Sequence, residues 1–192
     1  LLSTANINRR VIPAMRMSVR GELVAVASRD LDKARQYARE WEIPQAFESY
    51  EEMLASNEID AVYISLPNHL HAEWTIKALE AGVHVLCEKP FALTVREVDE
   101  MIAASQRTQR VLAEAFMYRH HPQTKMLGEM VQGGKIGELL AVCGVFNFAI
   151  ANRHNIRLEP DLGGGSLWDV GVYPLSLAQY LMGSTPDWVS AS

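Results

Sequence analysis

The tripeptide Glu88-Lys89-Pro90 carries the first side chains in this sequence that could act on a reacting group. It follows the apolar run Val83–Cys87, which has the composition of a buried strand. A lysine at the carboxyl end of such a strand lies where open α/β sheets place their active sites. Pro90 has no N–H group for strand pairing, so the strand ends there, and the Lys-Pro bond could be cis. A solvated lysine in an ordinary strand-to-helix loop is the alternative.

Asp169 and Tyr173 form a second candidate group, within the segment W-D-V-G-V-Y-P. Residues four apart on a helix lie on one face, so both side chains can reach the same ligand. A phenol can donate or relay a proton, and a carboxylate can hold a sugar hydroxyl. The alternative is a buried tyrosine together with an aspartate that stabilises the start of a helix.

Arg119, His120 and His121 form a third polar group, just after the strand-like run Val111–Ala115. They could line a cleft between two domains, or they could be the solvated start of a helix. No spacing of cysteines and histidines indicates a zinc site, and we expect no metal.

The start of the chain has features of a dinucleotide-binding turn. Leu1-Leu2 has the composition of a strand end, and a helix follows. A dinucleotide fold needs small residues between its first strand and first helix, so that the backbone can approach the diphosphate. Ser3, Ala5 and Asn8 occupy the positions where glycine is usual, which is a weak match. An ordinary tight turn is the alternative.

Two further loops could complete a cofactor site. Proteins that bind NAD usually carry an acidic residue after the second strand, but this chain has Ser28-Arg29. A hydroxyl and a guanidinium suit a 2′-phosphate, which favours NADP, although a solvated arginine is the alternative. The segment Pro67-Asn68-His69-Leu70-His71 could wall the ribose and the nicotinamide. His71 could then bind nearby or be a satisfied loop histidine.

Apolar runs and amphipathic segments alternate over the first 115 residues. Runs rich in valine are typical of parallel strands buried on both faces. The predicted strands are Glu22–Ser28, Asp60–Leu66, Val83–Cys87 and Val111–Ala115. The predicted helices are Leu31–Trp41 with an Asp30 cap, Tyr50–Ala55, His69–Ala81, and one from Thr94 through Ser105 with a Thr94/Glu97 capping box. This alternation predicts an α/β domain with a parallel sheet.

The pattern changes after this point, and we expect a second, α+β domain with an open sheet. Its predicted elements are a helix at Tyr118–Gln132, a long strand at Glu138–Ile150, a helix from the Gly163–Ser166 loop through Leu181, and a strand near Trp188. The expected domains are therefore 1–116 and 117–192. Because the chain begins like a strand end and stops like a strand beginning, we expect both ends to be truncated.

The composition is that of an ordinary globular protein, with 48% hydrophobic and 21% charged residues and a net charge of −5. This charge gives no general attraction to nucleic acids or anionic membranes, and no apolar run reaches the roughly 20 residues that span a bilayer. Cys87 and Cys143 lie in apolar runs and are predicted to be buried free thiols, which fits the reducing cytoplasm. We expect a cytoplasmic protein that acts on small molecules.

Three motifs, taken together and in order, resemble the Gfo/Idh/MocA oxidoreductase family. They are E-K-P after a buried strand, A-E-A-F-M-Y-R-H-H-P-Q, and G-G-G-S-L-W-D-V-G-V-Y-P. The resemblance covers nearly the whole chain and points to the branch of dihydrodiol dehydrogenases, glucose-fructose oxidoreductase and NADP-dependent xylose dehydrogenases. It implies a Rossmann domain followed by an α/β domain with a large open sheet. It also implies NAD(P)-dependent hydride transfer on a sugar, polyol or trans-dihydrodiol, and a homo-oligomer in the full-length form.

By the same resemblance, Lys89 would be the catalytic lysine, Asp169 would position the substrate and Tyr173 would be the acid/base. NADP, or alternatively NAD, would contact Ser3, Thr4, Ala5, Asn6, Ile7, Ser28, Arg29, Leu66, Pro67, Asn68, His71, Glu88, Lys89, Arg119 and Trp168. The chain departs from the family at Asn8, where glycine or alanine is usual, and its C-terminal domain stops early. The second hypothesis is therefore a non-catalytic NADP-binding fragment, or a sensor on the same fold.

Overall fold

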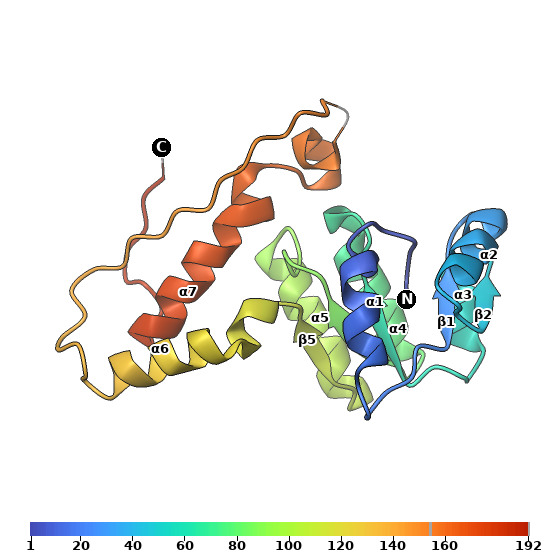
Figure 1. Cartoon of the computed structure of the whole chain (residues 1–192), viewed down its shortest axis with the longest axis horizontal. Helices are drawn as coiled ribbons and strands as arrows, with labels where there is room; N and C mark the ends of the chain where they lie inside the picture. The colour runs from blue at the N-terminus through green and yellow to red at the C-terminus, as the bar shows by residue number, and fades with distance from the viewer. Residues whose placement is uncertain (154, 192) are drawn as a thin grey trace. The chain divides into compact units, whose positions relative to one another are not determined.

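The computed structural model describes residues 1–153 and 155–191. The chain forms two compact units, one over Leu1–Ala115 and one from Phe116 onward. Figure 1 draws the first unit in blue to green and the second in yellow to red. Each unit is described by itself below.

The first unit is built on short parallel strands. They are β1 (Ala25–Ala27), β2 (Gln45–Phe47), β3 (Ala61–Ile64), β4 (His84–Cys87) and β5 (Leu112–Glu114). The strands pair in the orders β1-β2 and β3-β4-β5. Leu2 forms parallel bridges to Ala27 and Ile64 and so joins the two groups. The carboxyl ends of β1, β3, β4 and β5 therefore lie at one edge, which is where the predicted cofactor loops begin.

Several helices of the first unit begin at residues whose side chains cap them. The helices of this unit are α1 (Asn8–Arg16), α2 (Leu31–Glu40), α3 (Tyr50–Ala55), η1 (Asn68–Leu70), α4 (His71–Glu80) and α5 (Val95–Thr108). Asp30 accepts a hydrogen bond from the Lys33 N–H at 3.1 Å, as predicted. The predicted capping box of α5 is also present, with Thr94 and Glu97 each bonded to the other's backbone N–H. Such caps supply partners for N–H groups that the helix itself cannot pair.

Strands β1, β3 and β4 are mostly buried because both faces of the sheet carry apolar packing. Leu2, Ile64 and Cys87 belong to one core cluster with side chains of α3, α4 and α5. Val26 and Tyr63 point to the opposite face and pack with residues of α1 and α2. Burial on both faces explains why these strands appear in the sequence as continuous apolar runs.

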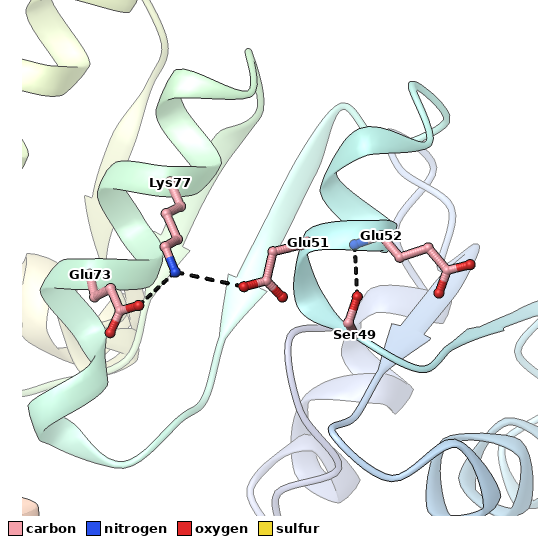
Figure 2. Close-up of polar contacts among 5 residues, drawn as sticks. All are labelled: Ser49, Glu51, Glu52, Glu73 and Lys77. Atoms are coloured by element: carbon pink, nitrogen blue, oxygen red, sulfur yellow. Dashed lines mark hydrogen bonds and ion pairs between the residues drawn. The ribbon is translucent and has the colours of Figure 1, made fainter.

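Charged side chains link α3 and α4 outside this core (Figure 2). Lys77 Nζ lies 2.6 Å from Glu73 Oε1 on the same helix and 3.7 Å from Glu51 Oε1 on α3. The hydrogen bond to Glu73 raises the pKa of Lys77 above its usual value. The ammonium group also lies 4.2 Å from the centroid of the Trp74 ring. Because these groups are exposed, the ion pairs orient side chains more than they stabilise the fold.

The second unit is helical within its described residues. Its elements are η2 (Met117–His120), α6 (Pro122–Gln132), η3 (Ile156–Leu158), η4 (Pro160–Leu162), a π-type turn η5 (Leu167–Gly171) and α7 (Val172–Met182). Gly128 allows α6 to approach α7 closely, because a Cβ there would lie 2.6 Å from the Tyr180 hydroxyl. The predicted helix at Tyr118–Gln132 is in fact two helices, since Pro122 starts α6 at its first position.

The strands predicted in the second unit are wrong for this structure. Glu138–Ile150 and the segment near Trp188 carry no strand assignment in the described residues and are mostly exposed. A strand forms only when a neighbour supplies backbone hydrogen bonds, and the described part of this unit offers none. The predicted burial of Cys143 is wrong for the same reason: Cys87 is buried, but Cys143 is exposed.

No helix in the described part of the chain is long and apolar enough to cross a membrane.

Candidate active site

The turn that precedes α1 contains the first group of predicted cofactor residues. This turn connects the bridge-forming Leu2 to the helix and consists of Ser3, Thr4, Ala5, Asn6 and Ile7. Ile7 is the N-cap residue of α1 and has no side chain that could cap it. The helix therefore begins without a side-chain cap, at the sheet edge where a diphosphate would bind in a dinucleotide fold.

Ser28 and Arg29 follow β1 at the same edge. Ser28 is buried, and its hydroxyl accepts a hydrogen bond from the Asp30 N–H at 3.3 Å. Arg29 is exposed, with its charge close to the Tyr50 hydroxyl. Burial raises the pKa of Tyr50, and the Arg29 charge opposes that rise. Tyr50 therefore contributes to the surroundings of Arg29, a role that the sequence did not indicate.

His71 connects two loops that were predicted to face the cofactor. Its ring is fully buried, with Nδ1 2.7 Å from the carbonyl oxygen of Pro90 and Nε2 2.8 Å from that of Leu66. Burial lowers the pKa of His71, while the two carbonyl groups and Glu88 oppose this shift. A buried ring can affect a cofactor only through the loops that it holds. Pro67 and Asn68, between those contacts, are half-buried.

We predict that acid destabilises the first unit through His71. The folded pKa lies below the unfolded value of about 6.5, so the unfolded chain binds the proton more readily. The contribution of His71 to stability is thus complete above about pH 6.5 and is lost as the pH falls below it. The melting temperature, followed by circular dichroism between about pH 7 and pH 5, should fall more steeply in the wild type than in His71→Asn.

The matched control is His120→Asn, because His120 is exposed and should leave the wild-type pH dependence intact. An equal fall of the melting temperature with pH in the wild type and in His71→Asn would contradict the role of His71 in acid destabilisation.

Lys89 follows β4, and its peptide bond to Pro90 is cis. Lys89 is half-buried and follows the buried Glu88. Glu88 accepts hydrogen bonds from the Tyr63 hydroxyl and from the Lys89 N–H, the latter at 3.2 Å. The Glu88 carboxylate therefore links the backbone of the candidate lysine to Tyr63 on β3. Tyr63 was not predicted to have this role, because its sequence context indicates only a strand.

Asp169 lies on η5 and Tyr173 on the first turn of α7, in the second unit. Arg157 Nε donates to Asp169 Oδ2 at 2.8 Å, and the carboxylate is only 13% exposed. The Tyr173 ring packs against three aromatic rings, Phe116, Tyr118 and Phe146, with centroids 5.3–5.8 Å away. The π-type turn is notable because such turns are frequent at functional sites.

A hollow of about 380 Å³ lies beside Asp169 within the second unit. Arg157 and Asp169 supply its charge, and Phe146 and Phe148 supply apolar surface. Gly164 allows a tight turn in its wall, because a Cβ there would lie 2.7 Å from the carbonyl oxygen of Arg157. Apolar rings with a few charged groups suit a hydroxylated ligand. A second hollow, of about 250 Å³, lies in the first unit. It is beside Ala25 and Ala61, where strands β1 and β3 begin.

Two of the remaining predicted residues, Arg119 and His121, have hydrogen-bond partners within the second unit. Arg119 Nε donates to Ser176 Oγ at 3.0 Å, and Tyr118 donates to the same hydroxyl at 2.8 Å. His121 accepts the Gln123 N–H and caps α6. Trp168 is half-buried on η5. No cluster of three or more potential metal ligands occurs among the described residues.

The structure thus divides the predicted site. The first unit brings the Ser3 turn, Ser28-Arg29, the Leu66 loop and Lys89 to one sheet edge, whereas Asp169 and Tyr173 belong to the second unit. Arg157 was missed because its pairing with Asp169 depends on the path of a loop that sequence patterns do not indicate.

Both units match known family models. Residues 4–116 match the GFO/IDH/MocA model described as an oxidoreductase family with an NAD-binding Rossmann fold. Residues 124–192 match the GFO/IDH/MocA C-terminal domain.

Similar proteins include two curated relatives. An uncharacterized oxidoreductase of Rhizobium meliloti is 47% identical over 95% of this chain and 54% of its own length. A D-xylose 1-dehydrogenase (NADP⁺) of Haloferax volcanii is 43% identical over 100% of this chain and 59% of its own. The chain therefore spans about half the length of the curated relatives that it matches.

Among solved structures, a 3-ketoreductase from Actinomadura kijaniata in complex with NADP and TDP-benzene has a TM-score of 0.88 and 35% identity. The match covers 94% of this chain and 56% of that one. Similar structures also include variants of that enzyme in which one lysine or one tyrosine is replaced.

Proposed function

We propose, on the premise that this chain belongs to the GFO/IDH/MocA oxidoreductase family, that it takes part in hydride transfer between NADP and a hydroxylated small molecule. The substrate class is a sugar, a polyol or a trans-dihydrodiol, reacting at a hydroxyl or carbonyl group. One observation carries the proposal. Lys89 and Arg29 follow strands whose carboxyl ends lie at one edge of the same sheet. This arrangement brings a charge-stabilising group and a phosphate-binding group to one edge of the sheet.

The residues of the first unit fit the cofactor. Arg29 would bind the 2′-phosphate of NADP with paired N–H donors, while the buried Ser28 shapes the loop. Tyr50 would support Arg29 from α3. The half-buried Pro67 and Asn68 would line the nicotinamide end, on the loop that His71 holds. NADP would be preferred over NAD because no acidic residue stands at the Ser28-Arg29 step, where NAD proteins usually have one.

The chain's own side chains would supply the proton chemistry, and the nicotinamide would supply the hydride acceptor. Tyr173 would take the hydroxyl proton when an alcohol is oxidised and return it when a ketone is reduced. Lys89 would stabilise the charge that develops on the reacting oxygen. Asp169 would accept a hydrogen bond from a neighbouring hydroxyl and so orient the substrate. Arg157 holds the Asp169 carboxylate in position for this purpose, through the ion pair described above.

A comparison of spacing supports these assignments. The lysine and the tyrosine replaced in the A. kijaniata reductase variants are separated by the same number of residues as Lys89 and Tyr173. That reductase was solved with NADP and TDP-benzene, and the H. volcanii relative is named for D-xylose and NADP⁺. Sugars and sugar nucleotides are therefore the first substrates to test. Homo-oligomer formation and a cytoplasmic location stay predictions.

We predict that the chain, given NADP⁺, oxidises at least one member of a panel of aldoses, polyols and trans-dihydrodiols. The assay is the appearance of NADPH absorbance, and the reverse reaction is tested with NADPH and a ketosugar. The matched negative control is Tyr173→Phe, which removes the hydroxyl and keeps the ring.

NADP⁺ binding without turnover of any panel member would favour the non-catalytic alternative. Equal rates in the wild type and Tyr173→Phe would contradict the role of Tyr173.

A further inference from the structure

Three buried polar side chains form a closed ring of hydrogen bonds beneath the turn that precedes α1. Ser3, Ser65 and Asn8 are 8%, 7% and 0% exposed. Ser3 ends the Leu1–Leu2 segment, Ser65 follows β3, and Asn8 is the first residue of α1. The ring therefore ties together two loops and the start of a helix at the carboxyl edge of the sheet.

The direction of each hydrogen bond in this ring follows from the number of available protons. Ser65 Oγ donates its one proton to Asn8 Oδ1 at 2.7 Å. Ser3 Oγ lies 2.8 Å from Ser65 Oγ and 3.2 Å from the Ser65 carbonyl oxygen, and it must then share its one proton between these two acceptors. Asn8 Nδ2 donates to the Ser3 carbonyl oxygen at 2.8 Å and closes the ring. A ring in which each member both donates and accepts strengthens its own bonds.

The ring supports a backbone conformation that normally requires glycine. Ser3 has a φ of +143°, a region that residues with a Cβ rarely adopt. Its hydroxyl also accepts the Ala5 N–H at 3.1 Å, which fixes the next step of the turn. The position is one at which dinucleotide folds usually place glycine. Hydrogen bonds of Ser3 therefore accompany a backbone conformation that is usually adopted by glycine.

The turn keeps backbone donors available for a ligand. The N–H groups of Thr4, Asn6 and Ile7 donate no hydrogen bond to any other part of the described chain. Thr4 and Ile7 are half-buried and Asn6 is exposed. Unpaired N–H groups before a helix form an anion-binding surface.

We propose that the Ser3–Ser65–Asn8 ring shapes this turn to bind the diphosphate of the dinucleotide cofactor, in place of the usual glycines. The inference rests on the proposed function, since the ligand is NADP. Ser3, Ser65 and Asn8 act as positioning residues, through the backbone of Thr4–Ile7. Asn8, which departs from the family pattern, becomes the residue that closes the ring.

The test compares two serine-to-alanine variants of the whole chain by calorimetric titration. Both substitutions lie in the first unit. Ser65→Ala should weaken NADP⁺ binding by about tenfold or more, because the ring is opened and the turn loses its shape. Ser56→Ala is the matched control: its hydroxyl donates to the Met53 carbonyl oxygen at 2.8 Å, at the end of α3. The control should bind NADP⁺ as the wild type does. Asn8→Ala is the second ring variant, and circular dichroism checks that each variant is folded.

A ligand without the diphosphate separates positioning from general loss of structure. Adenosine 2′-phosphate would contact Arg29 but not the turn, so Ser65→Ala and Asn8→Ala should bind it with wild-type affinity. Equal weakening of both ligands would overturn the proposal, and so would unchanged NADP⁺ binding in both ring variants. In the latter case the proposed function stands and only the ring fails. If the wild type binds neither ligand, the cofactor proposal fails and the ring's role fails with it.

Discussion

Lys89→Ala should lower kcat for hydride transfer by about a thousandfold while changing the Kd for NADP⁺ less than about fivefold. The lysine follows β4, and its backbone N–H donates to the Glu88 carboxylate. Its charge would act on the oxygen that becomes negative during the reaction, which is a transition-state interaction. Such interactions change kcat more than ground-state binding. The measurement is steady-state turnover beside calorimetric titration of the cofactor.

Lys77→Ala is the matched control for this variant. Lys77 also lies in the first unit, but it is held by Glu73 and Glu51 on the outer surface (Figure 2). Removing it should leave kcat within about twofold, as expected for a surface ion pair. Turnover of Lys89→Ala above about a tenth of the wild-type value would contradict a catalytic role for Lys89.

Arg29→Asp should weaken NADP⁺ binding by about a hundredfold and leave NAD⁺ binding equal or stronger. Two effects combine in this variant. The paired donors to the 2′-phosphate are lost, and the new carboxylate repels that phosphate. The same carboxylate can accept hydrogen bonds from the ribose hydroxyls of NAD⁺, as acidic residues usually do at this position. The variant therefore reverses the cofactor preference.

The control for Arg29→Asp makes the same change of charge within α2, which begins two residues after Arg29. Arg39 lies in the last turn of that helix, away from its start. Arg39→Asp should keep the wild-type preference for NADP⁺. A loss of preference in both variants would mean that net charge, rather than Arg29, decides the cofactor.

Much of the first unit could be predicted because its signals are local. The Asp30 cap, the Thr94/Glu97 capping box and the strand before Lys89 each depend on a few consecutive residues, and each is confirmed. Strand β2 was missed because its three residues, Gln45–Phe47, are too few to show a pattern. A cis bond before Pro90 was recognised only as an option, since sequence does not distinguish the two isomers.

The candidate site depends on contacts that local patterns do not encode. Ser65 belongs to a run that indicates only a buried strand, yet its hydroxyl completes the ring with Ser3 and Asn8. Arg157 reaches Asp169 across a loop. The strand predicted at Glu138–Ile150 is absent although the segment has the apolar composition of a strand, because a strand also needs a neighbouring strand for its backbone hydrogen bonds. Pattern therefore predicted which residues are chemical candidates, and tertiary structure decided what they contact.

The most direct test of the account is calorimetric titration of NADP⁺ and of NAD⁺ into the wild-type chain. The residues assigned to the 2′-phosphate and the diphosphate, Arg29 and the Thr4–Ile7 turn, all lie in the first unit. The account predicts saturable NADP⁺ binding at least about tenfold tighter than that of NAD⁺, from the Arg29 contact to the 2′-phosphate. Absence of binding by both cofactors, in a chain that circular dichroism shows to be folded, would contradict it.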